Sequence, residues 1–281
     1  MNAPESSGER RARAAFLQAC RLDVETAKPG NVSIASAGHG MTSAQFIISA
    51  GTAAAGLFTP GASVGARILD AVRRTFDAVA CNTNLGIVLL AAPLCAALER
   101  LPCDADIGTG QWRAQTEHVL ASLDIDDARL AYRAIAIANP GGLGDAPEQS
   151  VHEAPTIDLR TAMSLAADRD SIARQYANGF ADVFDAAQRA NIEENTAILG
   201  IFLSFLAALP DSHIVRRQGA AMAQSVTRDA AAHRARWLAA GAPMDDPKLA
   251  AWDAELKARG INPGTSADLA VATMFVALMT A

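Results

Sequence analysis

The run LGIVLLAAPLCAAL, which spans residues 85–98, decides the fold class of this chain. It holds no charged residue and shows no alternation of polar and apolar side chains. It therefore predicts a helix buried on every side rather than a strand with one exposed face. The run contains Pro93 and is shorter than the roughly twenty apolar residues that cross a membrane. We expect a core helix of a water-soluble protein, and no membrane partner.

The composition of the whole chain of 281 residues also favours helices. Hydrophobic residues make up 51% of it and aromatic residues only 5%, and alanine is the most frequent residue. Alanine is the best helix former, whereas strands prefer branched and aromatic side chains. The expected fold is all-α, a single compact multi-helix domain over residues 1–281 with a flexible segment 1–10. Apolar residues at helical spacing predict helices over residues 11–24, 42–57, 63–79, 87–98, 111–122, 126–138, 159–190, 191–209, 219–240 and 249–258, and a last helix after residue 266.

The charge balance excludes a general nucleic-acid binder. The formal net charge is −6 and the isoelectric point is near 5.4, whereas nucleic-acid binding needs a basic face. The segment Met1–Arg13 is charged and lacks the apolar stretch of a secretory signal, so we expect a cytoplasmic protein. The four cysteines form no CxxC pair and are expected to be free, buried thiols. They are Cys20, Cys81, Cys95 and Cys103.

Two features of the second half of the chain add to these expectations. Tyr176, Phe180 and Phe184 are spaced four residues apart and are expected to lie in the core. The stretch from Asn139 to Pro155 is rich in glycine and proline and is longer than most connections between helices. We expect a functional loop or a lid there, because its glycines permit large changes of the backbone.

Polar residues gather at five helix junctions, where rigid helical scaffolds commonly carry their sites. Helix N-termini, lysine and arginine bind phosphate, and aspartate and glutamate bind magnesium through oxygen. Each residue also has a plainer interpretation, because aspartate at a helix start is a typical N-cap and charged loop residues often face only solvent. The junctions contain Glu25, Thr26, Lys28, Asn31 and His39; Asn82, Thr83 and Asn84; Asn139 to Gly144; Asp211, Ser212, His213, Arg216 and Arg217; and Asn262 to Asp268.

The order of four of these junctions resembles the triphosphoribosyl-dephospho-CoA synthase family, over residues from about Phe16 to Phe275. The resemblance implies an all-helical fold and a magnesium-dependent reaction of ATP with dephospho-CoA. Adenine is expelled from ATP, and the triphosphoribosyl group is joined to a ribose hydroxyl of dephospho-CoA. The matching segments are Glu25-x-x-Lys28-Pro29-Gly30-Asn31-Val32, Asn82-Thr83-Asn84-Leu85-Gly86-Ile87, Asp211-Ser212-His213-Ile214 with Arg216-Arg217, and Asn262-Pro263-Gly264-Thr265-Ser266-Ala267-Asp268-Leu269.

Two positions depart from the family pattern and leave the donor open. Leu85 stands where better-characterised members carry a basic residue, and the segment His39-Gly40-Met41 lacks the acid that follows the histidine in those members. Such variants resemble members found with pathways to pterin one-carbon carriers. Phosphoribosyl diphosphate is therefore the alternative donor, with a tetrahydromethanopterin-type precursor as the acceptor.

The resemblance also implies which residues carry the reaction. Transfer of a ribosyl group from its anomeric carbon passes through an oxocarbenium-like state. Carboxylates are expected to hold Mg²⁺ on the donor phosphates, and one of them takes the proton of the acceptor hydroxyl. The expected metal ligands are Glu25, Glu194, Asp211 and Asp268, of which Asp211 and Asp268 are also the catalytic carboxylates.

The remaining roles concern the leaving group and the substrates. His39 and His213 are the candidate acids for a leaving adenine, because the pKa of histidine suits proton transfer near neutral pH. Lys28, Arg216 and Arg217 are expected to neutralise phosphate. The remaining substrate-binding candidates are Asn31, Asn82, Thr83, Asn84, Asn262 and Ser266.

Two other function classes stay open. A non-catalytic helical scaffold predicts an exposed apolar groove and no convergent acids and bases. A magnesium-dependent glycohydrolase would use water in place of the acceptor hydroxyl. The small residues of segment 51–65 permit close helix packing, which suits either a homodimer or a buried core helix.

Overall fold

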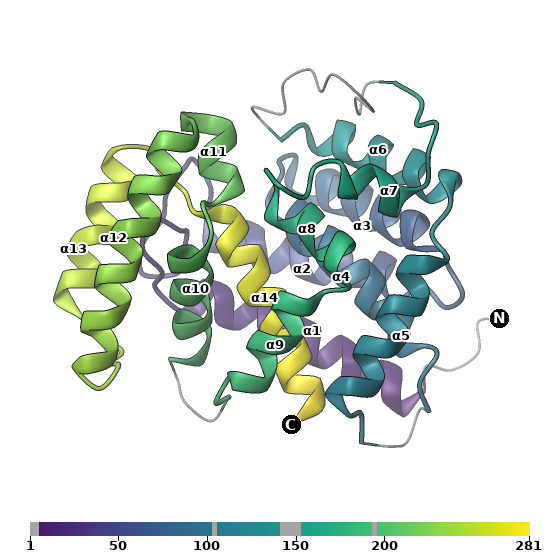
Figure 1. The fold of residues 1–281 in the computed structure, drawn as a ribbon, viewed down its shortest axis with the longest axis horizontal. Helices are drawn as coiled ribbons and strands as arrows, with labels where there is room; N and C mark the ends of the chain where they lie inside the picture. Colours follow the sequence, from purple (N-terminus) through teal and green to yellow (C-terminus); the bar gives the residue numbers. More distant parts are fainter. Residues whose placement is uncertain (1–5, 103–105, 141–152, 193–195) are drawn as a thin grey trace.

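A computed structural model describes residues 6–102, 106–140, 153–192 and 196–281 of the chain. These residues form fourteen α-helices and no strand, which confirms the all-α prediction (Figure 1). Cys103, Glu194 and most of the expected lid, residues 141–152, lie outside the described residues.

The helix boundaries follow the predicted pattern closely in the first half of the chain. Capping boxes start α1, α2 and α6, where the side chains of Ser6, Thr42 and Asp124 pair with residues three positions later. The helices are α1 Ser7–Glu25, α2 Ser43–Leu57, α3 Val64–Val79, α4 Leu85–Leu98, α5 Thr109–Ala121, α6 Ile125–Ala138, α7 Leu159–Ser164, α8 Ser171–Asn178, α9 Ala181–Arg189, α10 Ala197–Ala208, α11 Ser212–Gln218, α12 Ala220–Ala239, α13 Pro247–Ala258 and α14 Gly264–Thr280.

The core is built around the two most buried helices, α4 and α14. In Figure 1, α14 runs through the middle of the molecule, and it contacts α1, α4, α9 and α10. The ring of Phe275 on α14 meets the ring of Trp112 on α5 edge to face, with 5.4 Å between centroids. Burial of such apolar surface from distant parts of the sequence is the main force that holds the helices together.

Glycines let three helices of one layer approach closely. A Cβ at Gly56 of α2 would lie 2.5 Å from the backbone nitrogen of Ala71 in α3, and one at Gly65 of α3 would lie 2.6 Å from the carbonyl oxygen of Asp127 in α6. The amide of Gly65 also donates to the carboxylate of Asp127 at 2.7 Å. The N-terminal ends of α3 and α6 are therefore neighbours, and α2 packs along α3.

The prediction of one continuous helix over residues 159–190 is wrong. The segment forms α7, α8 and α9, because Asp170 caps a new helix and Gly179 and Phe180 both adopt left-handed backbone conformations. Tyr176, Phe180 and Phe184 are nonetheless all buried, as predicted. Their shared environment comes from packing between helices rather than from one helical face.

Two further observations concern the second half of the chain. The short helix α11 occupies the segment that the sequence pattern assigns to a junction, and the helix predicted from residue 191 begins at Ala197. No single described helix is long and apolar enough to cross a membrane. The helices α10 and α11 reach the required length and composition only together, with a bend of 54° between them.

Candidate active site

A cavity of about 1160 Å³ opens where the ends of several helices converge. Its lining includes the last residues of α1, the loop that follows, the start of α4, the start of α8, α11 and the start of α14. The charged lining residues all come from these elements, and we call them the charged half of the cavity. They are Asp23, His39, Arg169, Asp170, His213, Arg216, Arg217 and Asp268.

Asp268 is the carboxylate of the charged half whose oxygens are free of partners among the described residues. It lies on the second turn of α14, and no residue in the described part of the chain donates a hydrogen bond or an ion pair to it. Gly86, in the first turn of α4, makes room for it, because a Cβ there would overlap the carboxylate. Burial, and then the charges of Asp23 and Asp211, raise the pKa of Asp268 well above its usual range.

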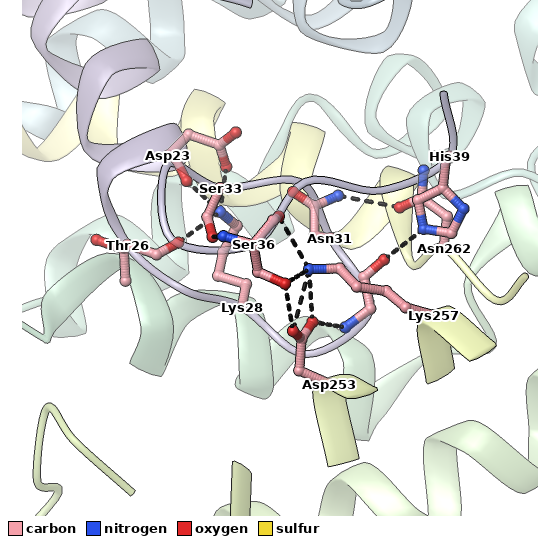
Figure 2. Close-up of polar contacts among 11 residues, drawn as sticks. Asp23, Thr26, Lys28, Asn31, Ser33, Ser36, His39, Asp253, Lys257 and Asn262 are labelled. Carbon is pink, nitrogen blue, oxygen red and sulfur yellow. Dashed lines mark hydrogen bonds and ion pairs between the residues drawn. The ribbon is translucent and has the colours of Figure 1, made fainter. Parts of the chain in front are cut away.

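Asp23 also faces the cavity and is held from behind by Lys28. The Lys28 ammonium lies 3.1 Å from a carboxylate oxygen of Asp23 and also donates to the backbone carbonyls of Asp23 and Thr26 (Figure 2). Burial raises the pKa of Asp23, and the charge of Lys28 opposes that rise. Lys28, expected to neutralise substrate phosphate, is fully buried and does not line the cavity.

The loop after α1 is fastened to the outer helix α13. The carboxylate of Asp253 accepts the amide of Gly30 at 2.8 Å and the hydroxyl of Ser36 at 2.9 Å (Figure 2). Lys257, one turn further along α13, donates to Ser36 and pairs with Asp253. Gly30 has a left-handed conformation, φ 77°, and a Cβ there would lie 2.8 Å from Pro263. These contacts press the loop against the segment that leads into α14.

Asn31 and Asn262, two of the predicted substrate-binding residues, meet at this contact. The Asn31 amide donates to the Asn262 side-chain oxygen at 3.0 Å, and both residues line the cavity. Each is buried, so their remaining donors and acceptors are available only to a bound molecule or to one another.

Both histidines line the cavity. His39 has a left-handed backbone, φ 56°, and its Nε2 lies 2.8 Å from the carbonyl oxygen of Gly30. Because a carbonyl only accepts, this nitrogen carries the proton. Burial, then the charges of Arg216, Arg217 and His39, lower the pKa of His213 to about 4. His213 is therefore neutral at neutral pH, which contradicts the expectation that its pKa suits proton donation there.

Asp211 lies outside the cavity wall and joins two helix starts. One carboxylate oxygen accepts the amides of His213 and Ile214 at the start of α11, and the other accepts the amide and hydroxyl of Ser266 in α14. Both oxygens are thus engaged within the protein, and neither Asp211 nor Ser266 lines the cavity. In the structure Asp211 is therefore the N-cap of α11, and its side chain does not line the cavity.

Arginines supply the positive charge of the cavity. Arg216 pairs with Asp170 at 2.6 Å, an ion pair that joins α11 to the start of α8. Arg217 and Arg169 are both exposed at the cavity, and no ion pair to either is seen within the described ranges. Two unpaired guanidinium groups at one end of a cavity suit a phosphorylated substrate.

The Asn82-Thr83-Asn84 segment leads into α4 as predicted, and all three residues line the cavity. The Asn82 side chain accepts the amide of Leu85 at 3.1 Å, and the Thr83 hydroxyl donates to Ser49 at 2.6 Å. The side-chain nitrogen of Asn84 is buried, and no described residue forms a hydrogen bond with it. Asn84 is thus the member of this segment that a substrate would satisfy.

Of the four expected metal ligands, Asp268 is the one that lines the cavity among the residues the structure describes. Glu25 is exposed, pairs with Arg21 and does not line the cavity, and Glu194 lies outside the described residues. No group of three histidine, cysteine, aspartate or glutamate side chains converges on one point among the residues the structure describes. The carboxylates that reach the cavity are Asp23, Asp170 and Asp268.

Sequence reasoning missed three of the charged residues at the cavity. Asp23 sits inside a helix, and Arg169 and Asp170 lie within a segment predicted as continuous helix. The signal available for Asp23 was its position five residues before Lys28, close to the Pro29-Gly30 bend that returns the lysine to it. For Asp170, the signal was an aspartate followed by serine, which is typical of a helix start.

Comparison with known proteins now identifies the family. The family model of ATP:dephospho-CoA triphosphoribosyl transferases matches residues 9–281, almost the whole chain. The chain belongs to this family. Members of it are transferases that move a triphosphoribosyl group to dephospho-CoA, so the protein belongs to a family of ribosyl-transfer enzymes.

The fold agrees with a solved structure. A crystal structure from Archaeoglobus fulgidus, provisionally described as a triphosphoribosyl-dephospho-CoA synthase, superposes with a TM-score of 0.67 at 22% sequence identity. The alignment covers 83% of this chain and 97% of the archaeal one. At that identity the likeness establishes the fold. No curated protein sequence matches this member of the family.

Proposed function

We propose that this protein transfers the triphosphoribosyl group of ATP to a ribose hydroxyl of dephospho-CoA, with release of adenine. The observation that carries the proposal is one cavity lined by the carboxylate of Asp268 and by the guanidinium groups of Arg169 and Arg217, none of which has a hydrogen-bond or ion-pair partner among the described residues. Ribosyl transfer develops positive charge at the sugar and leaves negative charge on the phosphates. The two kinds of side chain complement those two charges.

The expected magnesium fits this donor set. Mg²⁺ is usually held by one or two carboxylates together with substrate phosphates rather than by a complete protein cage. Asp268 has no protein partner in the described part of the chain, and Asp23 is close enough for its charge to raise the pKa of Asp268. Asp268, with Asp23 beside it, would hold the ion, which would neutralise phosphate charge. Asp211 is left out of this set because both of its oxygens accept hydrogen bonds within the protein.

The carboxylates and histidines carry out the proton transfers. Asp23 or Asp268 accepts the proton of the acceptor hydroxyl, since these are the carboxylates that face the cavity beside α4. His39 remains the candidate donor to the leaving base because it lines the cavity, whereas His213 is uncharged near neutral pH. Asn84 hydrogen-bonds the sugar or the base through its unpartnered nitrogen.

The test is product analysis with each donor. The purified protein is incubated with Mg²⁺, dephospho-CoA and ATP, and released adenine is measured by chromatography. Adenine with a matching mass increase of the acceptor supports the proposal, and ribose triphosphate without that increase indicates a glycohydrolase. A parallel reaction with phosphoribosyl diphosphate and a tetrahydromethanopterin-type acceptor tests the alternative.

One observation supports the alternative donor, phosphoribosyl diphosphate. Leu85 is buried at the cavity wall, at the position where the sequence pattern of the family has a basic residue. Phosphoribosyl diphosphate carries one phosphate on C5 of its ribose where ATP carries three, so it needs less positive charge beside that carbon. Turnover with phosphoribosyl diphosphate and none with ATP would replace the proposed donor.

A further inference from the structure

The cavity has a second half whose lining carries no charge. Between residues 41 and 81 and between residues 132 and 166, every described residue that lines the cavity is uncharged. We call this the uncharged half of the cavity. Its larger side chains are Phe46, Val79, Tyr132, Ile135, Met163 and Leu165.

The helices that contribute to this half are neighbours, since α2 packs on α3, α3 on α6 and α6 on α7. The side chain of Gln45, at the start of α2, contacts the sulfur of Cys81 just after α3 at 3.6 Å. The N-terminal ends of α3 and α6 meet at Gly65 and Asp127, and residues near both C-terminal ends line the cavity, so the two helices run side by side toward it. The start of α7 joins α6 through the amide of Leu159 and the carbonyl of Asp124, at 3.2 Å.

We infer that the uncharged half binds the uncharged arm of the acceptor, the amide-containing pantetheine chain of dephospho-CoA, while the charged half binds the phosphates. This inference rests on the proposed function. A cavity of about 1160 Å³ is larger than the roughly 300–1,000 Å³ that one small ligand usually fills, so it has room for parts of two substrates.

Ligand chemistry decides which substrate reaches the uncharged half. In ATP the adenine is bonded to the reacting carbon of the ribose, so it must lie near Asp268 and the other charged residues. In dephospho-CoA the arm is separated from the ribose hydroxyl by two phosphates and therefore extends furthest from the reacting atoms. Leu165, which lines the uncharged half, is 49% exposed, so this half reaches solvent and leaves room for the arm to extend away from the reacting atoms.

The test compares affinities by isothermal titration with Mg²⁺ present. The probes are dephospho-CoA, ATP, and ADP, which has the adenosine and two phosphates but not the arm. The variant Met163→Asp/Leu165→Asp places two negative charges in the uncharged half. Leu238→Asp on α12 is the matched control, since Leu238 is 47% exposed and does not line the cavity. Leu165→Asp alone is the second variant in case the double variant unfolds.

We expect the double variant to lose at least tenfold in affinity for dephospho-CoA and less than twofold for ATP and ADP. The control should bind all three like the wild type. Unchanged affinity for dephospho-CoA overturns the inference, as does an equal loss for ATP, which would place the donor base there. Wild-type protein that neither binds dephospho-CoA nor releases adenine overturns the proposed function as well. If the wild type releases adenine and the variants bind dephospho-CoA as tightly as the wild type does, only the inference is overturned.

Discussion

The ammonium nitrogen of Lys28 lies 3.1 Å from a carboxylate oxygen of Asp23, and both side chains are almost completely buried. Asp23 forms part of the cavity wall, whereas Lys28 is behind it. The lysine therefore holds that carboxylate in place and favours its charged form. The sequence pattern predicts that Lys28 neutralises substrate phosphate, and in the structure its ammonium group binds Asp23.

Lys28→Met should destabilise the protein, because it leaves a buried carboxylate without its partner. Loss of one partner of a buried ion pair typically costs about 3–5 kcal/mol. The free energy of unfolding from urea titration is the measurement. The double variant Asp23→Asn/Lys28→Met should regain much of that stability, since a neutral pair no longer buries an unpaired charge, but it should stay inactive. A double variant as unstable as Lys28→Met would show that Lys28 stabilises the fold independently of Asp23.

Gly86→Ala should lower turnover with little effect on stability. A Cβ at this position overlaps the carboxylate of Asp268, which must swing away, and a flexible side-chain end moves at low cost. We expect a loss of at least tenfold in kcat, with a free energy of unfolding within about 1 kcal/mol of the wild type because alanine favours the helix. Gly51→Ala on α2 is the control, because nothing lies within 4 Å of its Cβ position. Full activity of Gly86→Ala would remove Asp268 from the mechanism.

Asp268→Asn and Asp211→Asn should have opposite effects. Asp268 has no partner in the described part of the chain, so its amide variant should keep its stability and lose turnover. Asp211 accepts bonds from two helix starts, so its variant should lose about 1–3 kcal/mol of stability. Thermal melts and adenine release, measured on both proteins, separate the two roles. A stable but inactive Asp211→Asn would restore the catalytic role that the sequence pattern assigned to Asp211.

The stability of the protein should fall between pH 6.5 and pH 4 because of His213. Its pKa is lowered to about 4 in the folded state, so over this window the unfolded chain binds a proton that the folded chain does not. Stability is thus greater above pH 6.5 and decreases as the pH falls, by up to about 3 kcal/mol from this group. His213→Gln should reduce the difference between urea midpoints at pH 4.5 and 7.5. His118→Gln, at an exposed position in α5, should not. If the stability of the wild type and of His213→Gln depends on pH in the same way, the lowered pKa of His213 is contradicted.

The helix content and the core residues could be predicted from the sequence because they depend on local periodicity. The apolar run at 85–98 forms the predicted buried helix, and Asn82, Asn84 and Asp268 reach the cavity because each lies at or near a helix start. The helical breaks around Asp170 and Phe180 were missed since they depend on tertiary packing that stabilises unfavourable local conformations.

The protein partners of Lys28 and Asp211 could not be predicted for a related physical reason. Charge alone does not reveal whether a side chain faces substrate or another protein group. Lys28 folds back on Asp23, and Asp211 accepts the hydrogen bonds of two helix starts. Burial and partner geometry, which arise only in the folded chain, decide both cases.

The hydrogen bond between Gly30 and Asp253 also has a consequence for motion. Since α13 touches the loop through Asp253 and Lys257, the outer helix and the loop that carries Asn31 and His39 should open together as one cooperative unit of local unfolding. Their amides would then exchange with solvent at similar rates, slower when substrate fills the cavity. The helix α13 contributes none of the residues that line the cavity. The exchange rates of its amides would nevertheless show whether the cavity is occupied.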